Sequence, residues 1–139
     1  MGTKTNYPEE KLGWKLGSQA YTFRLYSFAQ ALDKIDSCGL RYVEIFPGQV
    51  IGDGSTEKVG AHLSKEGRQK MKKLAKDKGI TIQAFGVVGA KDAAEWEEVF
   101  LFAKEMGVQV INVEPSDEHL DIVSQLCDKY KIHAALHNH

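Results

Sequence analysis

The sequence predicts an α/β protein built on a parallel β-sheet, because one helix-to-strand unit recurs along its 139 residues. In three places a helical segment ends at a glycine, an apolar residue follows, and a strand then begins; the glycines are Gly39, Gly79 and Gly107. Glycine just past a helix adopts the left-handed conformation that other residues resist. Such alternation indicates either an open doubly wound sheet or part of an eight-stranded barrel, with right-handed crossovers.

Five strands are predicted from runs rich in β-branched and aromatic residues. They cover residues 15–22, 42–46, 81–85, 110–114 and 132–139. The last strand lacks a preceding glycine, but its entry through Tyr130, Lys131 and Ile132 follows the same order of residue types.

Four intervening helices are predicted from their N-terminal caps and from apolar residues at helical spacing. The expected caps are Ser27 and Asp92, each in a capping box with the residue three positions on, then Ser64, and Ser116 or Asp117. In the second helix Met71, Leu74 and Ala75 should face inward and the lysines outward. The basic stretch at residues 68–78 is therefore interpreted as a solvated helix face.

Charge and hydropathy exclude two classes of partner. The chain has 18 basic and 19 acidic residues and a formal net charge of −1, so no nucleic-acid partner is expected. No apolar run approaches the length of a membrane span, and no export signal is visible. The cellular compartment stays open: cytoplasmic, or periplasmic if an export signal has been removed.

Cys38 and Cys127 lack the spacing of a metal site and are predicted to be buried free thiols.

The connection after the second strand, residues 47–63, is much longer than the turns from helix to strand. Long loops at the carboxyl ends of strands are typical of a catalytic face in either fold. No glycine-rich phosphate-binding motif occurs there, so the sequence does not support a nucleotide site.

Polar residues stand at the predicted strand ends, where apolar residues would be easier to bury. They are Gln19, Tyr21, Thr22, Glu44, Asn112, Glu114, His137 and His139. A carboxylate buried in such a mouth needs a metal, a base or a hydroxyl as partner. His137 and His139, two positions apart on a strand, share one face and could bind a metal.

Structural interpretations compete with these. Glu44 could pair with a Lys or Arg of a neighbouring strand, and Glu114 could cap the helix that follows it. His62 and His119 are expected to face solvent, and His133 is taken as structural.

Residues 14–23, 39–46 and 136–139, taken in their order and spacing, resemble the sugar phosphate isomerase/epimerase family of xylose-isomerase-like barrels. The resemblance extends over nearly the whole chain from Trp14. It implies that residues 14–139 form about the first five strands and four helices of a TIM-type (β/α)8 barrel, preceded by a polar extension at residues 1–13.

The resemblance further implies a carbohydrate substrate and a divalent metal: manganese first, with zinc, cobalt or magnesium as alternatives. The activity implied is proton transfer next to a carbonyl on a sugar. His137 occupies the strand-five position where this family commonly has a glutamate ligand, and we expect it to bind the metal. The implied catalytic residues are Glu44 and His139, and the implied substrate-binding residues are Gln19, Tyr21, Glu44 and Glu114.

Other interpretations stay open. The histidine in place of a carboxylate is compatible with a lyase or hydratase acting on 3-keto sugars or 3-keto glycosides. Because later barrel strands and their ligands are absent from the sequence, the chain could also be a non-catalytic half-barrel, could self-associate, or could pair with a missing C-terminal half. An endonuclease with the same type of barrel is disfavoured by the near-neutral charge.

Overall fold

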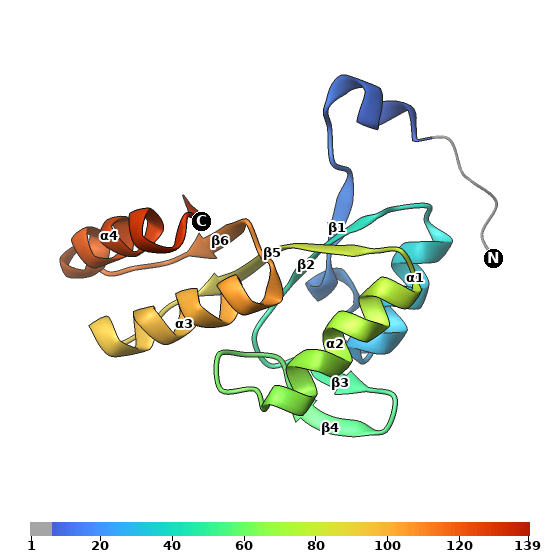
Figure 1. Ribbon diagram of the computed structural model, residues 1–139, viewed down its shortest axis with the longest axis horizontal. Coiled ribbons are helices and arrows are strands. Elements are labelled where there is room, and N and C mark those ends of the chain that lie inside the picture. Colours follow the sequence, from blue (N-terminus) through green and yellow to red (C-terminus); the bar gives the residue numbers. More distant parts are fainter. Residues whose placement is uncertain (1–6) are drawn as a thin grey trace.

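The computed structural model describes residues 7–139, which fold around a five-stranded sheet (Figure 1). Its strands are β1 (Gly17–Gln19), β2 (Tyr42–Ile45), β5 (Thr81–Val88), β6 (Val110–Val113) and β7 (His133–Leu136). They lie side by side in chain order, and each neighbouring pair is parallel. The predicted parallel sheet is therefore confirmed.

Helices connect the strands, and a small hairpin lies outside the sheet. The helices are α1 (Phe28–Ser37), α2 (Lys65–Asp77), α3 (Ala93–Met106) and α4 (Leu120–Tyr130), with 3₁₀ segments η1 (Pro8–Leu12), η2 (Ala20–Phe23) and η3 (Asp117–His119). The hairpin pairs β3 (Val50–Gly52) with β4 (Ser55–Lys58) inside residues 47–63, for which the sequence predicts a loop.

The first three helices begin at the predicted caps. Ser27 and Gln30 form a reciprocal capping box, and the side chains of Ser64 and Asp92 each accept the backbone N–H three residues on. The second predicted box is only half formed, because the Glu95 carboxylate accepts the amide of Lys91 instead of that of Asp92.

The fourth helix starts differently. The Ser116 hydroxyl lies 3.0 Å from Nδ1 of His119 and makes no capping bond to the backbone. The His119 ring packs edge-on against buried Trp96. The side chain of His119 is only 15% exposed, so the prediction that His119 faces solvent was wrong. The predicted inward face of α2 is confirmed, with Met71 and Ala75 buried and Leu74 partly buried.

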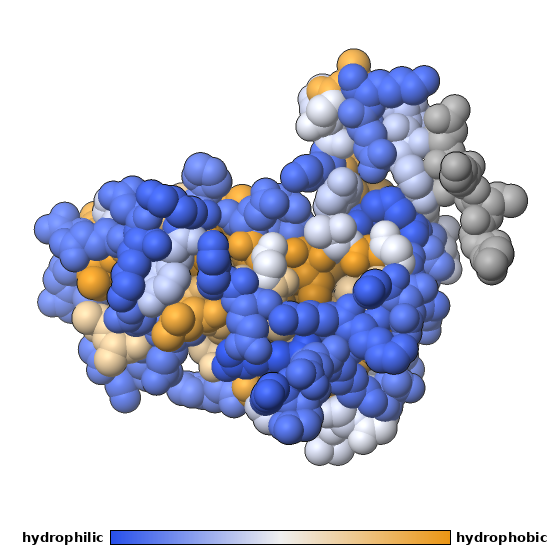
Figure 2. Space-filling model, viewed as in Figure 1, coloured by the Kyte–Doolittle hydropathy of each residue, from blue (hydrophilic) through white to orange (hydrophobic). Residues whose placement is uncertain are grey.

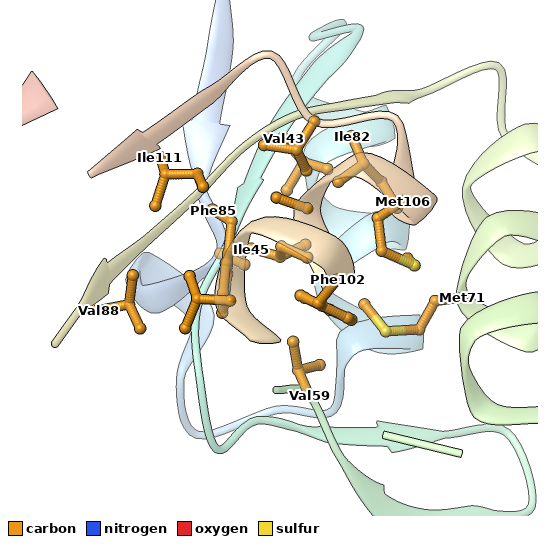
Figure 3. Close-up of a cluster of buried hydrophobic side chains, with 14 of the residues drawn as sticks. Val43, Ile45, Val59, Met71, Ile82, Phe85, Val88, Phe102, Met106 and Ile111 are labelled. Atoms are coloured by element: carbon orange, nitrogen blue, oxygen red, sulfur yellow. The ribbon is translucent and has the colours of Figure 1, made fainter. Parts of the chain in front are cut away.

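The hydrophobic core joins one face of the sheet to the helices (Figure 3). The strands contribute alternate residues such as Val43, Ile45 and Ile111, while Phe102 and Met106 of α3 approach from the helical layer. Polar residues on the same strands therefore project from the opposite face.

Strand β5 places its core residues at intervals of three because its register shifts twice. Val43 pairs with Ile82 but the next residue of β2 pairs with Ala84, and a second shift falls between Gly86 and Val88. Each extra residue re-aims the chain, so Ile82, Phe85 and Val88 are all buried. The strand was predicted to end at Phe85, and the broken alternation explains why three more residues were missed.

The two outer strands are shorter than predicted. Strand β1 stops at Gln19 because the Gln19 side chain accepts the amide N–H of Tyr21 at 2.8 Å and turns the chain into η2. Strand β7 stops at Leu136, although the amide of His137 still donates to the carbonyl of Val113 at 3.0 Å.

Both cysteines are free thiols. Cys127 is partly buried. Cys38 is exposed because it follows the last residue of α1, so its predicted burial was wrong.

Between residues 7 and 139, no helix has the length and apolar character needed to cross a bilayer.

Strands β1 and β7 each have a neighbour on one side only within the described chain. Leu16 beside β1 and Leu136 in β7 are 47% and 66% exposed, and Figure 2 shows hydrophobic residues at the surface across the middle of one face. Unpaired edges with apolar side chains favour association with other strands.

We therefore expect light scattering coupled to gel filtration to give a mass above the 15.5 kDa of one chain. A Leu136→Lys variant, which places a charge on the β7 edge, should shift the mass downward. A stable monomer of the unmodified chain at all accessible concentrations would contradict this expectation.

Candidate functional site

A cleft of about 500 Å³ opens where the parallel strands end. Its lining comes from β1, β2, β5 and the segments that follow β1, β2 and β7, so residues far apart in the chain meet there. The lining residues are Gln19, Tyr21, Glu44, Phe46, Pro47, Gly86, Val87 and His137. A concave site of this size suits a small molecule.

A hydrogen-bonded network centred on Glu44 forms one wall of the cleft. One carboxylate oxygen accepts from Nε2 of Gln19 at 2.7 Å, and the other accepts from Nδ2 of Asn112 at 2.5 Å. The amide of Gln19 also donates to the carbonyl oxygen of Gly86 at 2.9 Å. No Lys or Arg among residues 7–139 forms an ion pair with Glu44, so the structural interpretation of Glu44 as an ion-pair partner fails.

The orientation of the Gln19 amide in this network is fixed. Its oxygen accepts the backbone N–H of Tyr21, so its nitrogen must face Glu44 and Gly86. Because all three contacts depend on one orientation, Gln19 holds the carboxylate of Glu44 rather than offering free donors to a ligand.

Burial raises the pKa of the Glu44 carboxyl above its ordinary value, and this effect exceeds the opposing hydrogen bonds from Asn112 and Gln19 and the nearby His137. A carboxyl group in a cleft with such a pKa can bind or release a proton closer to neutral pH than an exposed glutamate.

This shift has a consequence for stability. The folded protein binds the Glu44 proton more tightly than the unfolded chain does. The stability that Glu44 contributes is therefore fully present below pH 4.5, the pKa of Glu44 in the unfolded chain. It is lost as the pH rises through the higher pKa of Glu44 in the folded protein. A Glu44→Gln variant, which has no proton to lose, should gain stability relative to the unmodified chain as the pH increases. Urea unfolding from about pH 4 to about pH 8 measures this.

A Glu66→Gln variant is the matched control, since Glu66 is an exposed glutamate of α2. It removes a carboxyl group that lies outside the cleft lining, so the pH-dependent gain in stability of Glu44→Gln should exceed any change in this variant. A flat difference in stability between Glu44→Gln and the unmodified chain would contradict the raised pKa of Glu44.

Two aromatic side chains also line the cleft. The rings of Tyr21 and Phe46 meet edge to face, with centroids 5.1 Å apart. The guanidinium of Arg24 lies 5.1 Å from the centre of the Tyr21 ring. Aromatic faces of this kind can pack against the C–H groups of a sugar ring, while polar groups set its orientation.

At the His137 side of the cleft, Glu114 and His139 lie close to His137, beyond the ends of β6 and β7. One potential ligand atom from each lies within 4.8 Å of the other two, and all three residues are exposed. Glu114 contacts Nε2 of His139 and does not cap the helix that follows. Imidazole nitrogens and a carboxylate oxygen are a donor set that fits a divalent transition metal.

The predicted site residues form two groups that share His137. Gln19, Tyr21, Glu44 and His137 line the cleft, and Glu114 and His139 cluster with His137 at its side. His62 and His133 are exposed and belong to neither group.

Two contributors were missed. Asn112 was noted as polar but not assigned to the site, although its position between Ile111 and Val113 repeats that of Glu44 between Val43 and Ile45. Gly86 could not be found from sequence, because its role depends on a backbone carbonyl.

No protein-family model and no curated protein matches the chain. Among solved structures, it is similar to an uncharacterised protein from Parabacteroides distasonis, with 33% identity and a TM-score of 0.86; the match covers 91% of this chain and 53% of that one.

Two further solved structures share the fold. One is a sugar phosphate isomerase/epimerase from Parabacteroides distasonis, with 17% identity, a TM-score of 0.63 and coverage of 90% of this chain and 51% of that one. The other is a D-psicose 3-epimerase solved in the presence of D-fructose, with 15% identity, a TM-score of 0.54 and coverage of 80% and 46%.

The chain therefore spans about half the length of the solved structures it matches. Its five parallel strands with alternating helices correspond to part of a TIM-barrel-like fold, which confirms the predicted fold class. At 17% and 15% identity, the likeness to these two structures shows a shared fold.

Proposed function

We propose that this chain is part of a carbohydrate enzyme of the sugar isomerase/epimerase type, which moves a proton next to a carbonyl group. The observation that carries the proposal is the cleft in which Glu44 is held by two side-chain amides and which the aromatic rings of Tyr21 and Phe46 also line. The fold shared with a sugar phosphate isomerase/epimerase and a D-psicose 3-epimerase supports it.

In this proposal Glu44 takes and returns the proton beside the carbonyl. Its raised pKa suits that role, and its fixed position avoids the need to reorder the side chain during the reaction. Gln19 and Asn112 position Glu44, and Tyr21 packs against the sugar ring.

A divalent metal fits the donors at the His137 end of the cleft, and when bound it would polarise the substrate carbonyl. Manganese, zinc, cobalt and magnesium are the candidates for this role. The aromatic rings of Tyr21 and Phe46 and the Glu44 network would orient the sugar in the cleft.

A test uses the full chain in D₂O with D-fructose and Mn²⁺. We expect deuterium to enter the sugar next to its carbonyl, and Glu44→Gln to slow that exchange by about 10²-fold or more. The side-chain amide NMR signals of Gln19 and Asn112 should also shift with D-fructose, and much less with D-mannitol, which lacks a carbonyl. Equal shifts with both sugars, or exchange unaffected by Glu44→Gln, would overturn the proposal.

A lyase or hydratase acting on 3-keto sugars or glycosides is a second candidate. The observation that favours it is that Glu44 is the one carboxylate among the lining residues described for the cleft. Epimerisation needs proton-transfer groups on both faces of the reacting carbon, whereas elimination can begin with one base. Release of the aglycone from a 3-keto glucoside, followed by NMR, together with no deuterium exchange into D-fructose, would favour this candidate.

A further inference from the structure

We propose that Glu114, His137 and His139 together form the ligand set of one divalent transition-metal ion. The inference deepens the proposed function and rests on it only for the role of the ion, since the ligand set is argued from geometry. It goes beyond the one ligand implied by the family resemblance, His137, by adding Glu114 from the end of β6 and the second imidazole of His139.

The spacing of the donors suits a shared ion. Two ligand atoms that are each about 2.1 Å from one metal lie at most about 4.2 Å apart. The three donor atoms are already within 4.8 Å of one another, and the rings of His137 and His139 have centroids 5.0 Å apart. Small rotations of exposed side chains are enough to close the remaining difference.

The main chain holds two of these ligands in place. The amide of Glu114 donates to the carbonyl of Val88, and that of His137 donates to the carbonyl of Val113, both at 3.0 Å. The hydrogen bonding of the parallel sheet thus continues past the ends of β6 and β7, so Glu114 and His137 project from adjacent, paired segments.

The Glu114 carboxylate is available for this role. Within residues 7–139 its one ion-pair partner is His139, itself a member of the cluster, and no Lys or Arg neutralises it. The side chains of Glu114 and His139 are 42% and 80% exposed, so an ion can reach them from solvent. A cation between them would replace the contact that they now make with each other.

The donor types indicate which metals should bind. Two imidazoles and one carboxylate on one side of an ion leave the other positions open, as in facial sites for divalent iron and related metals. Imidazole ligands favour zinc and cobalt over manganese, and magnesium, which prefers oxygen ligands, should bind weakest. The open positions could accept two neighbouring oxygens of a sugar.

The test is metal binding by the full chain, without any assay of activity. Co²⁺ is followed by visible absorption, and Zn²⁺, Mn²⁺ and Mg²⁺ by calorimetry. We expect one ion per chain, with Zn²⁺ and Co²⁺ bound at least about 10-fold more tightly than Mg²⁺. Glu114→Gln, His137→Ala and His139→Ala should each weaken Co²⁺ binding by about 10- to 100-fold or more.

His133→Ala is the matched control, because His133 is an exposed histidine of the same strand outside the cluster. It should bind Co²⁺ as the unmodified chain does, and circular dichroism should show that all four variants are folded. Unchanged binding by Glu114→Gln, an equal loss in His133→Ala, or equal affinity for Mg²⁺ and Zn²⁺ would overturn the ligand set. Carbonyl-dependent shifts of the Gln19 and Asn112 amides measured without metal would then still support the proposed function.

Discussion

Replacing Phe85 with alanine should lower the free energy of unfolding by about 3–5 kcal/mol. Phe85 is 1% exposed in β5, the central strand, and its ring meets that of Phe102 edge to face at 5.0 Å. Alanine would leave a cavity between the sheet and α3 and would remove this aromatic contact. Urea unfolding followed by far-UV circular dichroism measures the change.

A loss of this size is a large fraction of the stability of an ordinary domain, so Phe85→Leu provides a milder second variant that keeps most of the apolar volume. Leu25→Ala is the control, because Leu25 is 88% exposed and its truncation should change stability by at most about 0.5 kcal/mol. Similar losses for Phe85→Ala and Leu25→Ala would contradict the placement of Phe85 in the core.

Replacing Gly86 with alanine should disturb both the sheet and the cleft. A Cβ atom at this position would lie 2.5 Å from the carbonyl oxygen of Asn112 and 2.7 Å from the Asn112 Cβ. The first of these atoms belongs to the backbone of β6, so the two strands must move apart, at a cost of about 1–3 kcal/mol. The bond from Asn112 to Glu44 should lengthen, and the NMR signal of the Asn112 side-chain amide should shift.

Gly60→Ala is a suitable control, because nothing lies within 4 Å of a Cβ added there. This variant should keep the stability of the unmodified chain and the position of the Asn112 amide signal. A Gly86→Ala protein with both properties unchanged would show that β5 and β6 are not as close as described.

Local rules predicted much of the fold. The glycines after the helices marked three entries to strands, and hydroxyl and carboxylate caps marked the start of three helices, because each signal depends on neighbouring residues alone. Strand ends were predicted less well. Strand β5 was cut short because its register shifts place Phe85 and Val88 three residues apart, which a period of two does not anticipate.

The candidate site was predictable only as a set of strand ends. A parallel sheet with its strands in chain order brings Gln19, Glu44 and His137 together at the carboxyl ends of the strands. These polar residues stand out in the sequence from their apolar neighbours. The contact of His139 with Glu114 depends on how the chain runs after β7, and the part played by Gly86 depends on its backbone. Neither leaves a signal in residue type.

The Glu44 network also bears on the order of folding. Glu44 is separated from Gln19 by 25 positions and from Asn112 by 68 positions in the chain. Contacts of such high sequence separation form after local helices and turns, because a long loop must first close. During synthesis from the N-terminus, Glu44 can receive its second amide only once β6 has emerged and paired, so the proton-transfer group reaches its working geometry at a late stage of sheet assembly.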